Sequence, residues 1–488
     1  IDKEMYSKDS AYTLMDLAED DTNIEETVLN KIMVQQLMDM LESKERKIIN
    51  LRYFKNKTQS QVAKEMGMTV IVTDHHDIPK ELAKADAVVN PKQSDCPYPF
   101  KGLCGAAVAF KFVQLLYEQM GIPVEEADEF LENVGFATVG DVMDLQDENR
   151  ILVKIGLEML NHTKNLGMRA LILQNQLQPG ELKAHHIGFR IGPCLNASGR
   201  LDTAQRSLRL LLSEDVLEAG TLAAELVSLN EERKDMTALA VEDAKRVISE
   251  NGMEKDKVLV VFLPDCHESL AGIVAGRIRE QYDRPALVLT RGEESAKGSG
   301  RSVECYSMFE ELKKCDDLLL KYGGHPMAAG FSLEEAKIPE FRRRLNENTT
   351  LTWEDLTPKV VIDVPMPVDY VSEGLIQQLD CLEPFGKGNE KPAFADHDLE
   401  ICSARIFGNG SVVRLQLKSK HGTVRDAVYF GEPENLELSI AEKYGKVAAE
   451  AVMHGKRQPG VRMHFMYYPE INSYQGNESI QLRITGFC

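Results

Sequence analysis

The chain has 488 residues, with 43% hydrophobic and 27% charged side chains, which is the balance of a folded globular protein with room for three or four domains. Its formal net charge of −20 would repel nucleic acid if it were evenly spread, so a polyanion would need local basic grooves or bound cations. The apolar runs are too short to cross a bilayer, no leader pattern opens the chain, and the nine cysteines form no Cys-x-x-Cys pair, so we expect a cytoplasmic protein without a membrane partner, a zinc ribbon or a disulfide framework.

Residues 1–69 are predicted to form an all-helical segment. Apolar side chains recur with helical period through most of it, and Thr58 with Gln61 forms a capping box that opens a short helix over residues 59–66. A helix, a turn and a short helix make up the first half of a helix-turn-helix. The second, base-reading helix would begin at Thr69, but the β-branched run that follows predicts a strand, so that half is missing.

The β-branched run over residues 70–73 ends in three ligand-type side chains, Asp74, His75 and His76. Its composition predicts a buried strand, and open α/β sheets place their sites at the carboxyl ends of strands. Carboxylate and imidazole together suit a borderline divalent metal such as Mn²⁺. On spacing alone, a capped loop with two solvated imidazoles is an equal alternative.

The rest of the chain first alternates strands with helices and then becomes rich in strands. A strand over residues 87–90 and a helix over residues 106–119 predict a parallel sheet, followed by largely helical sequence. A charged helix leading out of residues 229–233 is interpreted as a connector between lobes. Short strands and turns after residue 355 predict a small barrel of the OB type. Strands are predicted over residues 258–262, 286–289, 412–417 and 427–430.

The predicted fold class is therefore α/β: a parallel-sheet lobe truncated at its N-terminal side, a second α/β lobe and an OB-like β-barrel, preceded by an all-helical segment. The predicted division is 1–69, the helical segment; 70–230, the first lobe; 231–255, the connector; 256–354, the second lobe; and 355–488, the barrel domain.

Five stretches have the character of motifs: Asp74–His76, Gly192–Arg200, Lys297–Ser302, Gly323–Gly330 and Pro384–Asn389. The first four resemble the DHH phosphoesterase superfamily, and the last, with the β-rich segment after it, resembles that superfamily's RecJ-type single-strand exonucleases. The resemblance covers about residues 70–488. It implies 5′→3′ degradation of single-stranded DNA in repair and recombination, Mn²⁺ or Mg²⁺ as cofactor, and a single-strand-binding protein or a helicase as a further partner.

The same resemblance implies that His75 and Asp141 are direct metal ligands, with Asp74 and His76 beside them, and that these four residues form the catalytic site. Phosphodiester hydrolysis by two ions needs several converging carboxylates or imidazoles. RecJ-type proteins supply some of them from an Asp-x-Asp and a further Asp upstream, and residues 1–69 contain neither pattern. We therefore expect one weakly held ion and impaired hydrolysis. From the residues alone, Asp141 is a helix cap after Gly140.

Phosphate contacts are implied at three motifs. Asn196 and Arg200 lie in a predicted small-residue turn, where Arg200 could instead pair with Asp202. A flexible loop is predicted to hold the DNA strand. A pair of adjacent glycines would direct main-chain N–H groups toward an anion, next to a histidine. The residues of these two motifs are Lys297, Ser299, Arg301, Ser302, Gly323, Gly324 and His325.

Several other residues carry weaker expectations. His267 and Gly272 match a family stretch near the same cleft, whereas the His185-His186 pair is interpreted as structural and placed in a predicted strand. The tail of the fourth motif, residues 328–330, is interpreted as close packing. Candidate aromatic platforms for bases are Phe385, Phe407, Tyr429 and Phe430, although most of them are expected to belong to the core.

The stretch Glu45–Phe54, continuing Thr58–Met68, resembles the promoter-binding C-terminal region of bacterial RNA polymerase sigma factors, closest to the sporulation type. The chain therefore reads as two unrelated segments joined near residues 69/70, each truncated there. A natural gene fusion and an assembly artefact both fit this pattern. We favour the artefact, because each side loses elements that its own function needs.

Three hypotheses follow. The first is a RecJ-like exonuclease, impaired as described. The second is a sigma-factor-like transcription protein that binds DNA or polymerase, which the missing recognition helix disfavours. The third is a DHH phosphodiesterase acting on short oligonucleotides or cyclic dinucleotides. The long β-rich tail favours a long strand over a dinucleotide.

Overall fold

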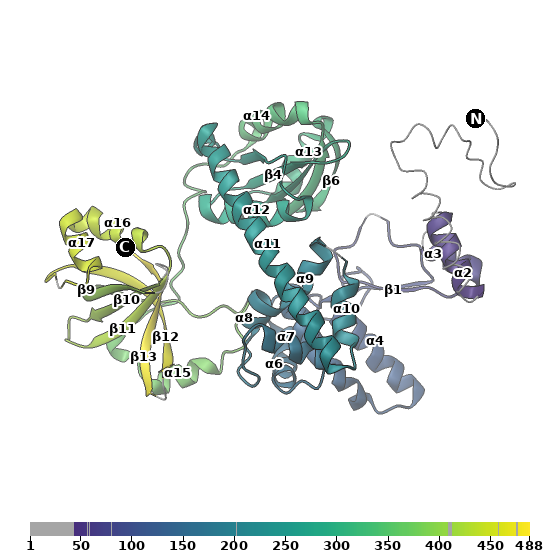
Figure 1. Cartoon of the computed structure of the whole chain (residues 1–488), viewed down its shortest axis with the longest axis horizontal. Helices are drawn as coiled ribbons and strands as arrows, with labels where there is room; N and C mark the ends of the chain where they lie inside the picture. Colours follow the sequence, from purple (N-terminus) through teal and green to yellow (C-terminus); the bar gives the residue numbers. More distant parts are fainter. Residues whose placement is uncertain are drawn as a thin grey trace. The chain divides into compact units, whose positions relative to one another are not determined.

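A computed structural model describes residues 43–488, except 56, 58, 80, 202, 408–411, 457 and 475–476. Figure 1 traces the described elements along the chain. Two compact units divide between Phe112 and Val113, and each is described by itself. The predicted capping residue Thr58 lies outside the described residues. In the described part of the chain, no helix is long and apolar enough to cross a membrane.

The N-terminal unit begins with short helices. Helix α2 (Ser43–Ile49) continues into the π-helical turn η1 (Asn50–Phe54), and α3 (Gln59–Met66) follows. Gly67 ends α3 with φ +64°, the left-handed backbone with which glycine commonly stops a helix. The predicted short helix and its end are confirmed.

A strand stands where a second helix of a helix-turn-helix would lie. Strand β1 (Ile71–Thr73) pairs in parallel with β2 (Ala87–Val89), which confirms the predicted parallel pairing, and helix α4 (Gly105–Met120) follows. The expectation of a buried strand is wrong, because Ile71 is 49% exposed. The described sheet here has two strands, and such a pair cannot cover both of its own faces.

The C-terminal unit opens with a helical lobe around one apolar core. Its longest helix, α11, is capped by Asp215, whose Oδ1 accepts a 2.7 Å hydrogen bond from the Glu218 N–H. The connector predicted to lead out of residues 229–233 is thus the second half of a helix that begins earlier. The elements are η2 (Val124–Phe130), α5 (Leu131–Gly140), α6 (Asp147–Asn161), α7 (Leu166–Gln174), α8 (Ala184–His186), η3 (Ile187–Ile191), α9 (Gly192–Leu201), α10 (Gln205–Leu212) and α11 (Val216–Glu250).

Helix α11 leads into the second, α/β lobe, where it packs on α12 (Figure 1). The sheet order is β3-β4-β5-β7-β6, with β3 and β4 parallel and the other pairs antiparallel. Alternate residues of β3 and β4 enter two different cores, so this pair is buried on both faces. The elements are η4 (Met253–Lys255), β3 (Leu259–Phe262), η5 (Glu268–Leu270), α12 (Ala271–Tyr282), β4 (Ala286–Arg291), β5 (Ala296–Arg301), α13 (Met308–Lys313), η6 (Asp316–Leu318), β6 (Leu319–His325), β7 (Ala328–Leu333), η7 (Glu335–Lys337) and α14 (Ile338–Asn348).

The last domain is a closed barrel. Strands pair in the order β9-β10-β11-β13-β12 and return to β9, and β8 adds to β9 from outside the ring. A closed ring of five strands is the OB architecture predicted from the sequence. The elements are β8 (Val364–Pro365), η8 (Val368–Tyr370), α15 (Glu373–Asp380), β9 (Phe394–Phe407), β10 (Val412–Lys418), β11 (Val424–Phe430), α16 (Pro433–Tyr444), α17 (Lys446–Met453), β12 (Arg462–Tyr474) and β13 (Asn477–Phe487).

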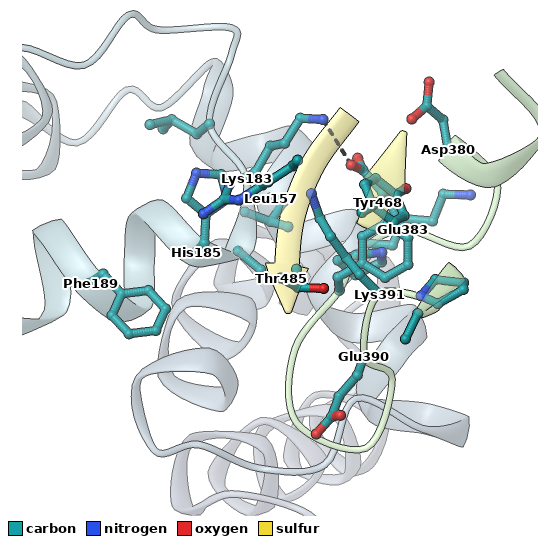
Figure 2. Close-up of a pocket in the computed structure, with 18 of the residues that line it drawn as sticks. Leu157, Lys183, His185, Phe189, Asp380, Glu383, Glu390, Lys391, Tyr468 and Thr485 are labelled. Atoms are coloured by element: carbon teal, nitrogen blue, oxygen red, sulfur yellow. Dashed lines mark hydrogen bonds and ion pairs between the residues drawn. The ribbon is translucent and has the colours of Figure 1, made fainter. Parts of the chain in front are cut away.

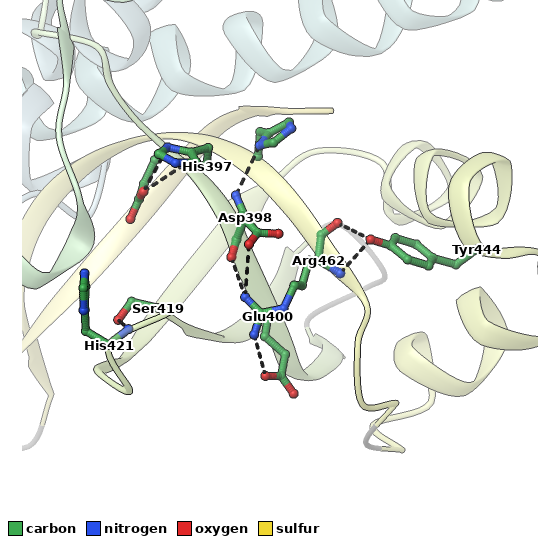
Figure 3. A network of polar contacts seen from close by, with 9 residues as sticks. His397, Asp398, Glu400, Ser419, His421, Tyr444 and Arg462 are labelled. Atoms are coloured by element: carbon green, nitrogen blue, oxygen red, sulfur yellow. Dashed lines mark hydrogen bonds and ion pairs between the residues drawn. The ribbon is translucent and has the colours of Figure 1, made fainter.

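Polar contacts reinforce the line where β12 closes onto β9 (Figure 3). The Arg462 Nη1 donates to the Asp398 carbonyl at 2.9 Å, and its Nη2 lies 3.4 Å from Glu400 Oε2. Tyr444 of α16 donates its hydroxyl to the Arg462 carbonyl at 2.7 Å. Arg462 therefore joins both closing strands to the helix beside them.

The Pro384–Asn389 motif docks the barrel on the helical lobe. The Leu145 N–H donates to the Lys387 carbonyl at 2.7 Å, and Gln146 Nε2 donates to the Gly388 carbonyl at 2.8 Å. Arg150 reaches the carbonyls of Cys381 and Glu383 at 3.0 and 3.2 Å. We call residues 381–389 the docking loop.

Candidate functional site

The carboxyl end of β1 holds the first candidate site. Asp74 Oδ1 accepts hydrogen bonds from the N–H groups of His75 and His76 at 2.8 and 3.2 Å, and lies 2.8 Å from His76 Nδ1. The hydrogen bond from the His76 side chain is the largest cause that lowers the pKa of the Asp74 carboxyl. Asp74 thus stays a carboxylate and orders the turn that carries both imidazoles.

Asn90, which the sequence analysis did not single out, supports this turn. It is 3% exposed, its Nδ2 donates to the His76 carbonyl at 2.9 Å, and its Oδ1 accepts from the Lys92 N–H at 2.9 Å. Its position as a polar residue directly after a predicted strand is the sequence signal that could have identified Asn90. On the other side, the first residue of α4 is Gly105, where an added Cβ would lie 3.3 Å from the His75 ring.

The expected metal donors are divided between the two units, with Asp74, His75 and His76 in the first and Asp141 in the second. Asp141 follows α5 as its C-terminal cap, with its N–H bonded to the Ala137 carbonyl at 2.9 Å, as the residues alone predict. Within the described residues, no three His, Cys, Asp or Glu side chains are grouped so that they could hold an ion. Within either unit, the described donors therefore do not suffice to hold a divalent ion.

The Asn196–Arg200 segment is helical, and the predicted turn is wrong. It belongs to α9, where Ala197 and Ser198 are fully buried, so the small residues permit close packing rather than an approach of backbone to phosphate. Asn196 and Arg200, four residues apart, share the exposed side of the helix. Arg200 Nη1 donates to the Ser269 carbonyl at 2.9 Å, and its alternative partner Asp202 lies outside the described residues.

Residues 297–301 lie in β5, an inner strand, and Ser302 directly follows it, so the predicted flexible loop is wrong. An added Cβ at Gly298 would lie 2.3 Å from the Phe331 ring, so this glycine serves packing. Arg301 lies against Gly272 of α12, and its Nη1 donates to Ser299 Oγ at 3.1 Å. Ser302 is buried and donates its hydroxyl to the Tyr306 carbonyl at 2.5 Å.

Gly323, Gly324 and His325 end the edge strand β6. Gly324 has φ +150°, and a Cβ there would lie 2.4 Å from the Ala328 carbonyl, so only glycine fits. Gly323 has open space around it. Ser299, Gly330 and Gly323 lie opposite one another on three neighbouring strands. The two glycines have no side chain, so they leave the sheet surface bare beside Ser299. Gly330, predicted only to pack closely, thus belongs to this surface.

This bare surface is the floor of a cavity of about 480 Å³, which brings together three predicted phosphate contacts, Lys297, Ser299 and Gly323. Lys297 forms a 2.8 Å ion pair with Glu268, and this hydrogen bond raises the Lys297 pKa. Both side chains are about half exposed. Such solvent-screened surface pairs contribute little to stability, so a phosphate could replace Glu268 at little cost.

Arg233, at the middle of α11, was missed by the sequence analysis. Its Nε and Nη2 both donate to Asn230 Oδ1, at 3.2 and 2.9 Å, and Asn230 is 2% exposed. Burial first, and then the positive charge of Arg200, lower the pKa of both Arg233 and Arg301. The charge of Arg200 thus acts on both Arg233 and Arg301, and the hydrogen bonds of the three arginines run to uncharged acceptors.

The remaining candidates have clear structural surroundings. His185 and His186 lie in α8, so the predicted strand is wrong, and His186 Nδ1 accepts from the Lys183 N–H at 3.0 Å as part of the helix cap. His267 caps η5, with Nδ1 2.7 Å from Ser269 Oγ. Of the aromatic candidates, Phe407 and Phe430 are about half exposed.

Comparison with known proteins gives matches along most of the chain. Three family models match: the DHH family N-terminal domain over residues 10–137, the DHHA1 domain over 255–350, and the RecJ OB domain over 362–486. The first match begins well ahead of the predicted join near residue 69/70. The resemblance of residues 1–69 to sigma factors stays a prediction.

Relatives agree with these matches. The chain is 37% identical over 431 residues to the single-stranded-DNA-specific exonuclease RecJ of Bacillus subtilis, with 87% of this chain and 52% of that protein covered. For the Escherichia coli RecJ, identity is 32%, with 86% and 73% covered. The crystal structure of Thermus thermophilus RecJ with Mn²⁺ superposes with a TM-score of 0.69 at 28% identity, over 88% of this chain and 60% of that one. The chain thus spans about half of the Bacillus relative.

Proposed function

The chain belongs to the RecJ family, and on that premise we propose that it is a metal-dependent exonuclease that degrades single-stranded DNA from the 5′ end. The observations that carry the proposal are Arg301, which donates to Ser299 on the floor of the cavity, and Arg200, whose positive charge acts on both Arg301 and Arg233. Guanidinium groups placed together with uncharged partners are costly unless an anion joins them, and a phosphodiester fits both their charge and their geometry.

We propose residue roles in line with this. Asn196, Arg200, Lys297, Ser299 and Arg301 would contact the phosphates of the strand, with the main chain at Gly323 and Gly324 and the side chains of His325 and Ser302 nearby. Asp74, His75, His76 and Asp141 would hold Mn²⁺ or Mg²⁺, the ions bound in the Thermus crystal structures. Because residues 1–69 lack the upstream aspartate pattern, hydrolysis is proposed to be weak.

The test uses single-stranded DNA labelled at the 5′ or the 3′ end, incubated with purified chain and Mn²⁺, Mg²⁺ or EDTA. We expect slow, ion-dependent release of the 5′ label first, little attack on duplex, and none in EDTA. A rate equal to that of a complete RecJ would contradict the proposed impairment. Preferential cleavage of a cyclic dinucleotide, or no binding of single strands at all, would contradict the exonuclease itself.

We also propose a domain division, a cellular location and protein partners for the chain. The division into 1–69, 70–230, 231–255, 256–354 and 355–488, a cytoplasmic location, and a single-strand-binding protein or helicase as partner are proposed on the resemblance. Co-purification of the tagged chain with either class of partner, with and without nuclease treatment, tests the last of them. Loss of the partner after nuclease treatment would mean that only DNA links the two.

A further inference from the structure

The connection between α5 and α6, residues 141–146, carries Asp141 of the proposed catalytic site and lies against the docking loop of the barrel domain. The Leu145 N–H donates to the Lys387 carbonyl at 2.7 Å. Leu145 is 2% exposed, and an added Cβ at Gly386 would lie 2.7 Å from its Cδ1. The docking loop therefore holds this connection both by a hydrogen bond and by close packing.

The connection begins with a strained residue. The Val142 N–H donates to the Val139 carbonyl at 3.1 Å, and the Met143 N–H donates to the Thr138 carbonyl at the same distance. This pattern commonly ends a helix on a left-handed glycine, but here the left-handed residue is Val142, with φ +55°. The conformation costs free energy for a β-branched residue, because its Cβ crowds the main chain. Val142 is 62% exposed, so burial of its own side chain does not offset that cost.

The connection also ends at a left-handed residue, because Asp147, the first residue of α6, has φ +43°. Contacts from the docking loop reach the residues between these two ends. Lys387 Nζ lies 2.9 Å from Asp144 Oδ1, and Gln146 Nε2 donates to the Gly388 carbonyl at 2.8 Å. Non-glycine residues keep such a backbone where their surroundings fix it. Docking of the barrel is thus part of what fixes the connection.

Beside the docking loop, positive charges of the two domains repel one another. Burial first, and then positive charges that include Lys391 and Arg483 of the barrel domain, lower the pKa of His185 in α8 to about 4. Lys183 of the helical lobe is paired with Glu383 of the docking loop at 2.8 Å, as Figure 2 shows. Docking therefore depends on the contacts of the loop itself, and its loss would release the barrel.

We propose that the docking loop is the positioning element for Asp141: docking of the barrel holds the connection in its strained conformation, and release of the barrel lets Val142 relax and Asp141 leave its place. The inference rests on the proposed function only for the role of Asp141. It makes turnover depend on barrel docking even for a substrate too short to reach the barrel.

The double variant Arg150→Ala and Glu383→Gln should release the barrel. It removes two hydrogen bonds to docking-loop carbonyls and the ion pair with Lys183, and among the described residues neither side chain bonds to the connection. Amide hydrogen exchange is measured in EDTA, where hydrolysis plays no part. Exchange at Met143 should become about tenfold faster, because its N–H closes the strained turn. Adding Val142→Gly should return exchange to within about twofold of the unmodified chain, since glycine adopts this backbone freely.

Turnover of the linear dinucleotide pTpT with Mn²⁺ separates positioning from a weaker hold on DNA. The double variant should lower kcat about tenfold, because misplacement of one group slows the chemical step. KM should change little, since the dinucleotide is too short to need the barrel. Addition of Val142→Gly should restore kcat, which a loss of DNA contacts would not allow.

Two variants serve as matched controls. Arg284→Ala also removes a guanidinium that donates to two main-chain carbonyls, those of Glu254 and Asp256 in the α/β lobe. It should leave exchange at Met143 unchanged. Val216→Gly replaces another exposed valine, at the start of α11, and should not restore exchange in the double variant.

Gly388→Ala is a second route to release, and limited proteolysis at the docking loop shows whether the barrel is released in each variant. Unchanged exchange at Met143 in the released variants would overturn the inference even if the chain hydrolyses DNA. Faster exchange that Val142→Gly fails to restore would also overturn it. The expected exchange pattern without any hydrolysis of single strands would count against the exonuclease and not against the coupling of the loop to the connection.

Discussion

At the scale of single residues, the candidate phosphate site holds positive charges that no described carboxylate neutralises. Arg200, Arg233 and Arg301 come from α9, α11 and β5, and each donates to an uncharged oxygen. Burial first, and then repulsion from the like charge of Arg200, lowers the pKa values of Arg233 and Arg301. In the free protein this repulsion is unfavourable, and a bound anion would remove it. Relief of the repulsion therefore adds to the affinity for the anion.

Arg233→Gln should raise the dissociation constant for single-stranded DNA in EDTA about tenfold, because a hydrogen bond to a charged group is worth about 1.5–3 kcal/mol. The salt slope should fall by about 0.7. Arg233→Lys should not restore binding, since lysine cannot fill both donor positions toward Asn230. Arg246→Gln is the control, because Arg246 lies on the same helix and pairs with Asp243. Equal affinities for the Arg233 and Arg246 variants would exclude a phosphate contact at Arg233.

His185 should titrate near pH 4 in the folded chain, well below its ordinary value of about 6.5. Because its folded pKa is depressed, its contribution to stability is fully present above about pH 6.5 and is lost as pH falls toward 4. In the variant with Lys391→Gln and Arg483→Gln, the pKa should rise but stay below 6.5, since burial is the largest cause. Side-chain NMR titration measures both values, and an ordinary pKa in the unmodified chain would contradict the placement of these cations.

At the scale of elements, glycines in similar sequence contexts have different structural roles. Gly298 sits on β5 against the Phe331 ring, Gly324 has a backbone conformation and a close contact that only glycine tolerates, and Gly323 faces open space. Only the last can be substituted without moving the sheet. The glycine-rich composition of β5 therefore reflects packing rather than flexibility.

Gly298→Ala should destabilise the α/β lobe by at least about 1–3 kcal/mol, because the new methyl group overlaps a buried ring. Gly323→Ala should fold normally and weaken DNA binding instead, because its methyl group would stand on the bare cavity floor. Urea unfolding followed by the fluorescence of Trp353, with binding measured in parallel, separates the two effects. Normal stability for the Gly298 variant would refute the packing role.

The docking loop offers a second prediction at this scale. Gly388 has φ +72°, and an added Cβ would lie 3.0 Å from the Asp144 Cβ. Gly388→Ala should cost about 1–2 kcal/mol from the left-handed backbone alone and loosen the barrel from the helical lobe. Limited proteolysis at the loop should become faster. Gly374→Ala, on α15 with nothing within 4 Å, should resist protease as well as the unmodified chain does.

At the scale of the whole molecule, the apolar interior is divided. The barrel, the helical lobe and the two faces of the α/β sheet each enclose their own cluster of buried side chains. Cooperative unfolding requires shared core contacts, and those between the barrel and the helical lobe that we describe are mainly polar.

Calorimetry should therefore resolve more than one unfolding transition in the full chain. Gly388→Ala should shift the transitions apart, because it weakens the docking that couples them. The measurement compares the calorimetric enthalpy with the van't Hoff enthalpy of each peak. A single transition with equal enthalpies would show that the lobes are coupled far more strongly than their polar contacts suggest.

Local sequence determined the elements whose signals lie within a few neighbouring residues: the short helix ending at Gly67, the β-branched strands at residues 71–73 and 259–262, and the strand-rich barrel. It also placed Asp74, His75 and His76 at the end of a strand. Tertiary structure alone decided that the small-residue motif at 196–200 is a helix and that the glycine-rich residues 297–301 form an inner strand, because partners far along the chain supply the packing. It also brought Arg233 beside Arg200, a grouping that depends on the packing of α9 against α11 and that no local pattern encodes.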